Sequence, residues 1–247
     1  MNPVNLHIAD TTDELSHHIA DWLVTYSQEV LERRNRFTIA LSGGSTPKQL
    51  YRLLASDEYK DRIDWNQWHV FWGDERFVPF ADERNNAKMA FDELLSHVPV
   101  PQNQVHTIPT CVEPGLAVAS YQQLLHRYFD RQLYTFDLVL LGLGDNAHTL
   151  SLFPGYTDIL FDKTTWVKAF HLEEQDMYRI TLTSAIVNNA GRVAFLVSGN
   201  DKSTAVRHVV AGSYDPTRYP AQLIRPLNDE LYWFIDKQAA AGLQYAV

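Results

Sequence analysis

Residues 137–155 contain the side chain best suited to acid–base catalysis. The segment reads DLVLLGLGDNAHTLSLFPG, in which the apolar run Leu138–Leu141 is followed by Gly142, Gly144 and then His148. Open parallel sheets place their chemistry just beyond the carboxyl ends of their strands, and a histidine there can move a proton at neutral pH. The pattern predicts a general base at His148. The alternative is an ordinary strand-to-helix turn with an incidental histidine.

A turn of small residues is a candidate for binding an anion. It follows the apolar run FTIALS and comprises Ser42, Gly43, Gly44, Ser45 and Thr46. Glycines let the backbone approach a ligand closely, and the N–H groups at the start of a helix favour an anion. The spacing matches neither a P-loop nor GxGxxG. A tight turn in which Ser45 or Thr46 caps the following helix is the alternative.

Three charged residues, Asp74, Glu75 and Arg76, follow Gly73 at the end of an aromatic, strand-like run. We expect them to lie outside the core, because an unpaired buried charge is costly. The planar guanidinium of Arg76 suits a phosphate or a developing oxyanion. A solvated strand end with a local Asp–Arg pair is the alternative.

The turn SGNDK, residues 198–202, supplies a cation at the start of a further helix. Lys202 is expected in the first helical turn, where the helix dipole disfavours a cation by roughly a few tenths of a kcal/mol. An anionic ligand would neutralise that lysine, whereas a flexible surface lysine is the alternative. Arg207 lies five positions later and need not share its face, so it is the weaker candidate. Together these loops offer anion donors, a base and cations, which suits proton transfer on a phosphorylated small molecule.

The elements that must position these loops alternate along the chain. Hydrophobic periodicity predicts helices at 12–35, 48–56, 85–96, 115–132, 185–189 and 201–212. Strands are predicted at 37–42, 68–74, 137–142, 166–172, 178–183 and 192–199, with a late edge strand at 232–236. This alternation predicts an α/β fold with a mostly parallel sheet covered on both faces.

Composition limits the function classes. The 247 residues carry a net charge of −9, which disfavours non-specific binding to nucleic acid. No apolar run approaches the roughly 18 residues of a membrane span, and the N-terminus lacks the pattern of a signal peptide. The single cysteine, Cys111, excludes an intramolecular disulfide, so we expect a cytoplasmic protein. Metal-site spacings and the GxSxG pattern are absent, and no feature indicates an oligomeric state.

Several segments, in this order along the chain, resemble the 6-phosphogluconolactonase family. They are LSGGSTPKQLY, FWGDERFVP, GLGDNAHTLSLFPG, RITLTSAIVNNA, VAFLVSGNDKS and the closing YPAQLIRP and LYWFID. The resemblance implies one domain, 1–247, with the three-layer, Rossmann-like sandwich of glucosamine-6-phosphate deaminase and ribose-5-phosphate isomerase. It also implies hydrolysis of 6-phospho-D-glucono-1,5-lactone to 6-phospho-D-gluconate in the oxidative pentose phosphate pathway, without a metal or an organic cofactor.

The same resemblance implies roles for individual residues. His148 corresponds to the proposed base, whereas Arg76 and Lys202 correspond to the residues proposed to hold the phosphate of the substrate. Two relatives in function remain as alternatives. A glucosamine-6-phosphate deaminase-like isomerase would carry MDEY-like and HIAFNEP-like segments, which this chain lacks. A non-catalytic sugar-phosphate-binding module would keep the pocket without the chemistry.

The chain departs from the family pattern beside the histidine. Where the family usually reads D-G-H-T, this chain has Asn146 and Ala147 before His148. Asn146 can accept a hydrogen bond from the imidazole N–H but brings no charge, so Asp145 and Asp74 are the candidates to supply one. If the family glycine has a positive φ, Ala147 costs about 1 kcal/mol there.

Overall fold

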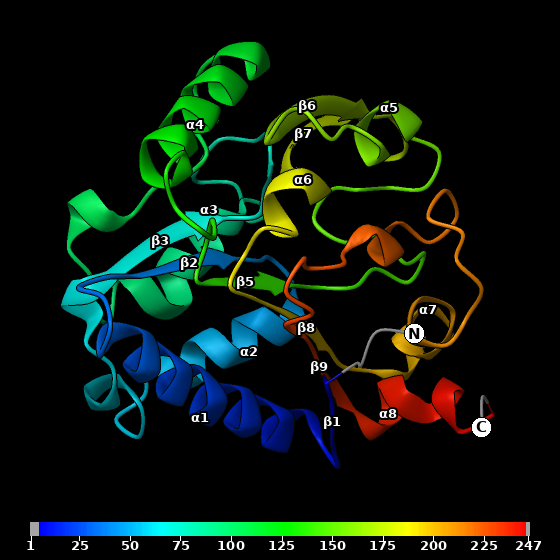
Figure 1. Cartoon of the computed structure of the whole chain (residues 1–247), viewed down its shortest axis with the longest axis horizontal. Helices are drawn as coiled ribbons and strands as arrows, with labels where there is room; N and C mark the ends of the chain where they lie inside the picture. Colours follow the sequence, from blue (N-terminus) through cyan, green and yellow to red (C-terminus); the bar gives the residue numbers. More distant parts are fainter. Residues whose placement is uncertain (1–4, 246–247) are drawn as a thin grey trace.

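The computed structural model describes residues 5–245, which form an α/β architecture built on two sheets (Figure 1). The larger sheet has six strands in the order β1-β9-β8-β5-β2-β3, and every neighbouring pair is parallel. Its strands are β1 (Asn5–Ala9), β2 (Phe37–Leu41), β3 (Trp68–Trp72), β5 (Leu138–Leu141), β8 (Arg192–Val197) and β9 (Leu231–Asp236). The predicted mostly parallel sheet is confirmed.

Helices cover both faces of this sheet. They are α1 (Thr12–Leu31), α2 (Ser45–Leu54), α3 (Asn86–Ala90), α4 (Pro114–Phe129), α5 (Thr157–Leu160), α6 (Ser184–Val187), α7 (Ser203–Val210) and α8 (Lys237–Ala240). Figure 1 shows α1 and α2 on one side of the sheet, with α4 and α6 on the other. No helix among the described residues is long and apolar enough to cross a membrane.

The predicted apolar stripe of the first helix is confirmed. Leu15, Ile19 and Leu23 of α1 are fully buried, because spacings of three and four residues place side chains on one face of a helix. At the N-terminus of α1, the Thr11 hydroxyl accepts a hydrogen bond from the backbone N–H of Glu14 at 3.1 Å. This cap satisfies one of the free N–H groups of the first turn.

A second, antiparallel sheet lies beside the first. It contains β4 (Asp74–Arg76), β7 (Met177–Leu182) and β6 (Val167–Leu172) in that order. Gly73 joins the two sheets, because its N–H donates to the carbonyl of Leu41 and its own carbonyl accepts from Leu182. A Cβ at Gly73 would lie 2.7 Å from a methyl carbon of Leu150, so a side chain at this junction would require Leu150 to move.

Two expectations about the sheets need correction. The strand predicted at 232–236 is not an edge strand, since β9 lies between β1 and β8. The edge next to β9 is β1, which sequence reasoning missed because this short strand is mostly exposed and shows no alternation of buried and exposed residues. The segment after Gly73, expected as a loop, is the edge strand β4 of the second sheet.

Some predicted helices have different limits in the structure. The first ends at Leu31 rather than at residue 35. The segment predicted at 85–96 divides into α3 and a π-helical turn, Phe91–Leu95. The segment predicted at 201–212 divides into a 3₁₀ turn, Asn200–Lys202, and α7. Helix ends vary by a residue or two with local hydrogen bonding, which a periodic pattern does not encode.

Candidate active site

Residues from all four candidate loops line one cavity at the carboxyl ends of the strands. The lining includes the anion loop (Ser42–Thr46), Asp74 and Arg76 of β4, part of the histidine loop (142–150), and two residues of the lysine turn (198–202). A parallel sheet places the ends of its strands along one edge, so loops far apart in sequence meet there. The cavity brings the imidazole and the anion loop into a single site.

The anion loop leaves the first N–H groups of α2 without a side-chain cap. The cap position is Gly44, with φ 111°, and not Ser45 or Thr46 as expected, since α2 already begins at Ser45. Only glycine adopts such a φ without strain. The Thr46 hydroxyl instead shares a 2.7 Å hydrogen bond with the hydroxyl of Ser198, which ties the anion loop to the lysine turn. A helix start of this kind is suited to an anionic ligand.

His148 is held tightly within its loop. A Cβ at Gly144 would lie 2.0 Å from Nδ1 of His148, so the imidazole occupies space that only a glycine leaves open. The ring also stacks on Phe153, with centroids 4.1 Å apart. The space left by Gly144 and the stacking on Phe153 therefore hold the plane of the ring.

Asn146 determines which nitrogen of His148 carries the proton. Its Oδ1 accepts the backbone N–H of His148 at 3.2 Å and lies 2.6 Å from Nδ1 of the same residue. The contact with the backbone N–H identifies this atom as the amide oxygen, which cannot donate. Nδ1 is therefore the protonated nitrogen, and Nε2 keeps the lone pair that a base requires.

Burial lowers the pKa of His148 to about 4, and Arg179 and Lys202 act in the same direction. Asp74, and to a lesser extent Asp145, oppose this lowering through their negative charge. The imidazole is therefore neutral at pH 7, as a proton acceptor must be. Both carboxylates that sequence reasoning named as candidate charges act on the ring, with Asp74 the stronger.

The backbone at Ala147 has φ 62°, in the left-handed region. A residue with a Cβ is strained there by roughly 1–2 kcal/mol. Two backbone hydrogen bonds hold this conformation: the Ala147 N–H donates to the carbonyl of Gly144 within the turn, and the Ala147 carbonyl accepts from the N–H of Ala221 in a distant segment. The strain that the sequence analysis expected for a positive φ at Ala147 is therefore present.

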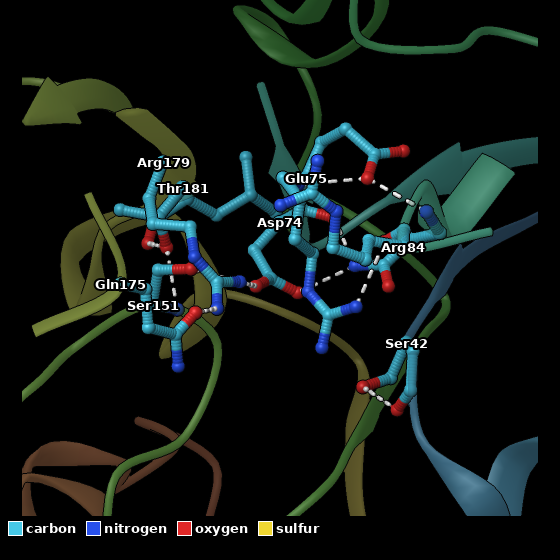
Figure 2. A network of polar contacts seen from close by, with 12 residues as sticks. Ser42, Asp74, Glu75, Arg84, Ser151, Gln175, Arg179 and Thr181 are labelled. Carbon is cyan, nitrogen blue, oxygen red and sulfur yellow. Dashed lines mark hydrogen bonds and ion pairs between the residues drawn. The ribbon is translucent and has the colours of Figure 1, made fainter. Parts of the chain in front are cut away.

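Asp74 connects β4 to three neighbouring elements (Figure 2). Its Oδ2 accepts a 2.7 Å hydrogen bond from the hydroxyl of Ser151 and lies 3.8 Å from a guanidinium nitrogen of Arg179. Its Oδ1 and backbone carbonyl face the side-chain amide of Asn86. The carboxylate is almost completely buried, yet it faces the cavity.

Glu75 contradicts the expectation that the charged triplet lies outside the core. Its exposed fraction is 0%, and that of Asp74 is 5%. Burial raises the pKa of Glu75 to about 7, although hydrogen bonds from the backbone N–H groups of Arg76, Asn86 and Ala87 oppose the rise. The expectation failed because those N–H groups, two of them more than ten residues away, replace the water that a carboxylate needs.

Arg76 and Arg179 are directly opposed across β4 and β7. Like charges at such a pair repel, and both residues line the cavity. Each has a buried Nε with no hydrogen-bond partner among the described residues, although Arg76 also donates to the carbonyl of Arg84 and Arg179 to Gln175. The pKa of Arg179 is lowered, chiefly by burial. An anion bound between the two guanidinium groups would offset their repulsion and accept hydrogen bonds from the two unpaired Nε–H groups.

Sequence reasoning missed Arg179, Asn86 and Ser151, and it placed Ser198 in a candidate turn without giving it a role. A charged residue inside the otherwise strand-like segment YRITLT was the available signal for Arg179, because strands rarely bury an arginine without a partner. The other three are small polar residues that local sequence does not distinguish from ordinary turn residues.

Lys202 and Arg207 have different positions relative to the cavity. Lys202 closes the 3₁₀ turn before α7 and lines the cavity, with its ammonium 3.1 Å from the carboxylate of Asp201. Arg207 is exposed on α7 and is not part of the lining, so the structure does not bring it to the other candidates. Among the described residues, no group of three or more His, Cys, Asp or Glu side chains is placed to hold a metal ion.

Comparison with known proteins assigns the chain to a family. The family described as glucosamine-6-phosphate isomerases/6-phosphogluconolactonase matches residues 10–233. The chain is 38% identical over 231 residues to a 6-phosphogluconolactonase of Nostoc sp., with 92% of each chain covered. It is 37% identical over 226 residues to that of Synechocystis sp., covering 90% of this chain and 91% of the relative.

Solved structures agree with this assignment. One described as devB protein has a TM-score of 0.88 at 32% identity and covers 97% of this chain and 99% of its own. The 6-phosphogluconolactonase of Trypanosoma brucei has a TM-score of 0.86 at 25% identity, with 98% and 100% covered. A monomeric glucosamine-6-phosphate deaminase, at 20% identity and a TM-score of 0.83, shares the fold, with 96% and 99% covered. The chain belongs to the glucosamine-6-phosphate isomerase/6-phosphogluconolactonase family.

Proposed function

We propose that this protein hydrolyses 6-phospho-D-glucono-1,5-lactone to 6-phospho-D-gluconate, a step of the oxidative pentose phosphate pathway. The observation that carries the proposal is one cavity in which a neutral histidine faces a cluster of cations and a helix start. The relatives named 6-phosphogluconolactonase over nine-tenths of the chain support the same activity. The reaction needs a base and an anchor for the phosphate, and the cavity offers both.

The phosphate of the substrate binds among Arg76, Arg179, Lys202 and the anion loop. The paired arginines offer guanidinium N–H groups in planar forks, a geometry that matches phosphate oxygens. The free N–H groups at the start of α2 and the hydroxyls of the anion loop add neutral donors. Holding the distant phosphate in this way orients the lactone ring, so that binding energy is converted into alignment of the reacting atoms.

His148 acts as the general base. Its Nε2 removes a proton from a water molecule while the water oxygen forms a bond to C1 of the lactone, and the carbonyl electron pair moves onto its oxygen. N–H groups of the surrounding loops stabilise this oxyanion. When the carbonyl re-forms, the bond between C1 and the ring oxygen breaks. The proton on Nε2 then passes to the ring oxygen and leaves an open-chain acid.

The experiment is lactone hydrolysis by the wild type and by His148→Ala, corrected for the spontaneous reaction. A positioned base contributes about 10²–10⁴-fold, so the variant should lose turnover by this order while its affinity for 6-phosphogluconate changes little. Wild-type turnover in the variant would remove His148 from the mechanism.

Two other functions share this pocket, and the same assays separate them. Release of ammonia from glucosamine 6-phosphate would favour a deaminase-like isomerase. Binding of 6-phosphogluconate without hydrolysis would favour a sugar-phosphate-binding module. The substrate is a small molecule, and the acidic chain is not expected to bind nucleic acid or a membrane. A single domain, a reaction without metal or cofactor and a cytoplasmic location remain predictions.

A further inference from the structure

Glu75 is a buried carboxylate that the proposed mechanism does not use. Its Oε1 accepts the backbone N–H groups of Arg76 and Asn86 at 2.8 and 2.7 Å, and its Oε2 accepts that of Ala87 at 2.8 Å. All three donors belong to the backbone. The side chain therefore joins the strand β4 to the start of α3, across a chain separation of more than ten residues.

The start of α3 carries Asn86, which packs against the anion loop. The side-chain amide nitrogen of Asn86 donates to the backbone carbonyl of Asp74 at 3.0 Å and approaches its carboxylate at 3.4 Å. This orientation turns Oδ1 towards Gly43, where an added Cβ would lie only 2.0 Å from it. The position of the Gly43 backbone is therefore set by the Asn86 side chain, and that of Asn86 by Glu75.

We propose that Glu75 is a positioning residue for the anion loop, acting through the backbone and side chain of Asn86. A carboxylate that accepts N–H groups from two segments holds those segments in a fixed relative position. Displacing either segment would leave a buried charge without its hydrogen-bond partners. This inference rests on the proposed function, since it assumes that the anion loop holds the phosphate of the substrate.

Only the ionised form of Glu75 can accept all three N–H groups. The charges around Glu75 determine the pH at which that form takes up a proton. Asp74 on β4 repels the charge, whereas Arg179 on β7 lies close enough to interact with it. Tyr121 of α4 also lies close enough to interact with it electrostatically. Burial and Asp74 raise the pKa to about 7, so proton uptake as the pH falls through neutrality weakens the link to α3.

The test compares the wild type with Glu75→Gln at pH 8, using calorimetric binding of 6-phosphogluconate and lactone hydrolysis. Glutamine has nearly the same shape, but its NH₂ group would meet an N–H donor. We expect the dissociation constant and KM to rise by between about 10- and 100-fold, because the loss of a hydrogen bond from the anion loop to a charged phosphate has an effect of this size. The value of kcat should fall by less, since His148 does not touch Glu75.

Asp137→Asn is the matched control. Asp137 is also buried and accepts the backbone N–H and hydroxyl of Thr38, but it precedes β5 at the opposite end of the strand from the cavity. This variant should lower the unfolding temperature and leave the affinity for 6-phosphogluconate unchanged. A folded Glu75→Gln that binds as tightly as the wild type would overturn the proposal, as would an equal loss of affinity in Asp137→Asn.

Asn86→Ala gives a second route if Glu75→Gln does not fold. It removes the contact with Gly43 but leaves the bonds between Glu75 and the backbone, and it should reproduce the loss of affinity; wild-type affinity would contradict the inference. The wild type should also lose more affinity than Glu75→Gln between pH 8 and 6, a comparison in which titration of the ligand cancels. An inactive wild type would instead refute the proposed function.

Discussion

Replacing Asn146 by Asp tests directly whether His148 is the titrating base. The substitution keeps the shape of the side chain and places a negative charge against Nδ1, which now lies 2.6 Å from a neutral amide oxygen. The carboxylate would stabilise the imidazolium that forms when Nε2 takes a proton. It should therefore raise the pKa of His148 from its present value of about 4.

The size of the effect follows from the geometry. Charges centred about 4 Å apart interact by about 1 kcal/mol in water and about 4 kcal/mol at an effective dielectric constant of about 20. Asn146 is exposed to solvent, so the lower part of this range applies. A gain of about 1–2 kcal/mol moves the acid limb of kcat/KM upward by about one pH unit. Above that limb, kcat should rise by up to about tenfold, since the same charge favours the transition state.

The assay is initial-rate lactone hydrolysis between pH 4 and 8, with the spontaneous rate subtracted at each pH. Titration of the His148 ring by NMR gives the same change without reference to activity. Asp145→Asn is the control, because Asp145 acts on the ring only at a distance. Removing the charge of Asp145 should lower the pKa of His148 slightly and move the acid limb of kcat/KM to a slightly lower pH.

An acid limb that stays in place in Asn146→Asp would refute the reasoning. It would show that the group controlling activity is not the imidazole held by Asn146. An acid limb that moves to lower pH would also refute the reasoning, because a negative charge beside the imidazole can only raise the pKa of His148.

Two further predictions concern other residues. Arg179→Lys keeps the charge facing Asp74 but loses the planar fork, and loss of a hydrogen bond between charged groups should raise KM about 10–100-fold; an unchanged KM would limit Arg179 to an ion pair with Asp74. Burial, with His69, lowers the pKa of His106 to about 4. Below about pH 6.5 His106 is protonated in the unfolded chain but remains neutral in the folded protein. The free energy of unfolding therefore falls by up to about 3 kcal/mol towards pH 4. Urea unfolding at pH 7 and 5 should show a smaller loss in His106→Leu than in the wild type; equal losses would contradict this explanation.

Local pattern was a good guide to the elements around the site. The buried stripe of α1 and the fully buried strands β2 and β5 follow from spacing and from runs of apolar residues. Glycines marked the turns, because Gly44 needs a positive φ and Gly144 leaves room for the His148 ring. These features depend on neighbours within a few positions, which is the range that a sequence pattern describes.

Charge burial was the point at which local pattern failed. Nothing near Glu75 in sequence indicates that Asn86 and Ala87 will donate to it, so the triplet was expected outside the core. Arg179 can be recognised as a cavity residue only after β7 pairs with β4 and places it opposite Arg76. The exposed strand β1 exists because β9 offers it a parallel partner more than two hundred residues away.

The amino-acid sequence alone determined which loops offer groups suited to the proposed chemistry: an imidazole, glycines and hydroxyls that admit an anion, and cations, each placed after an apolar strand. Only the tertiary structure decided which of these groups share a cavity and how Glu75 can be buried. The physical reason is one of range. Apolar periodicity is written in adjacent residues, whereas a buried charge depends on donors that distant segments bring to it.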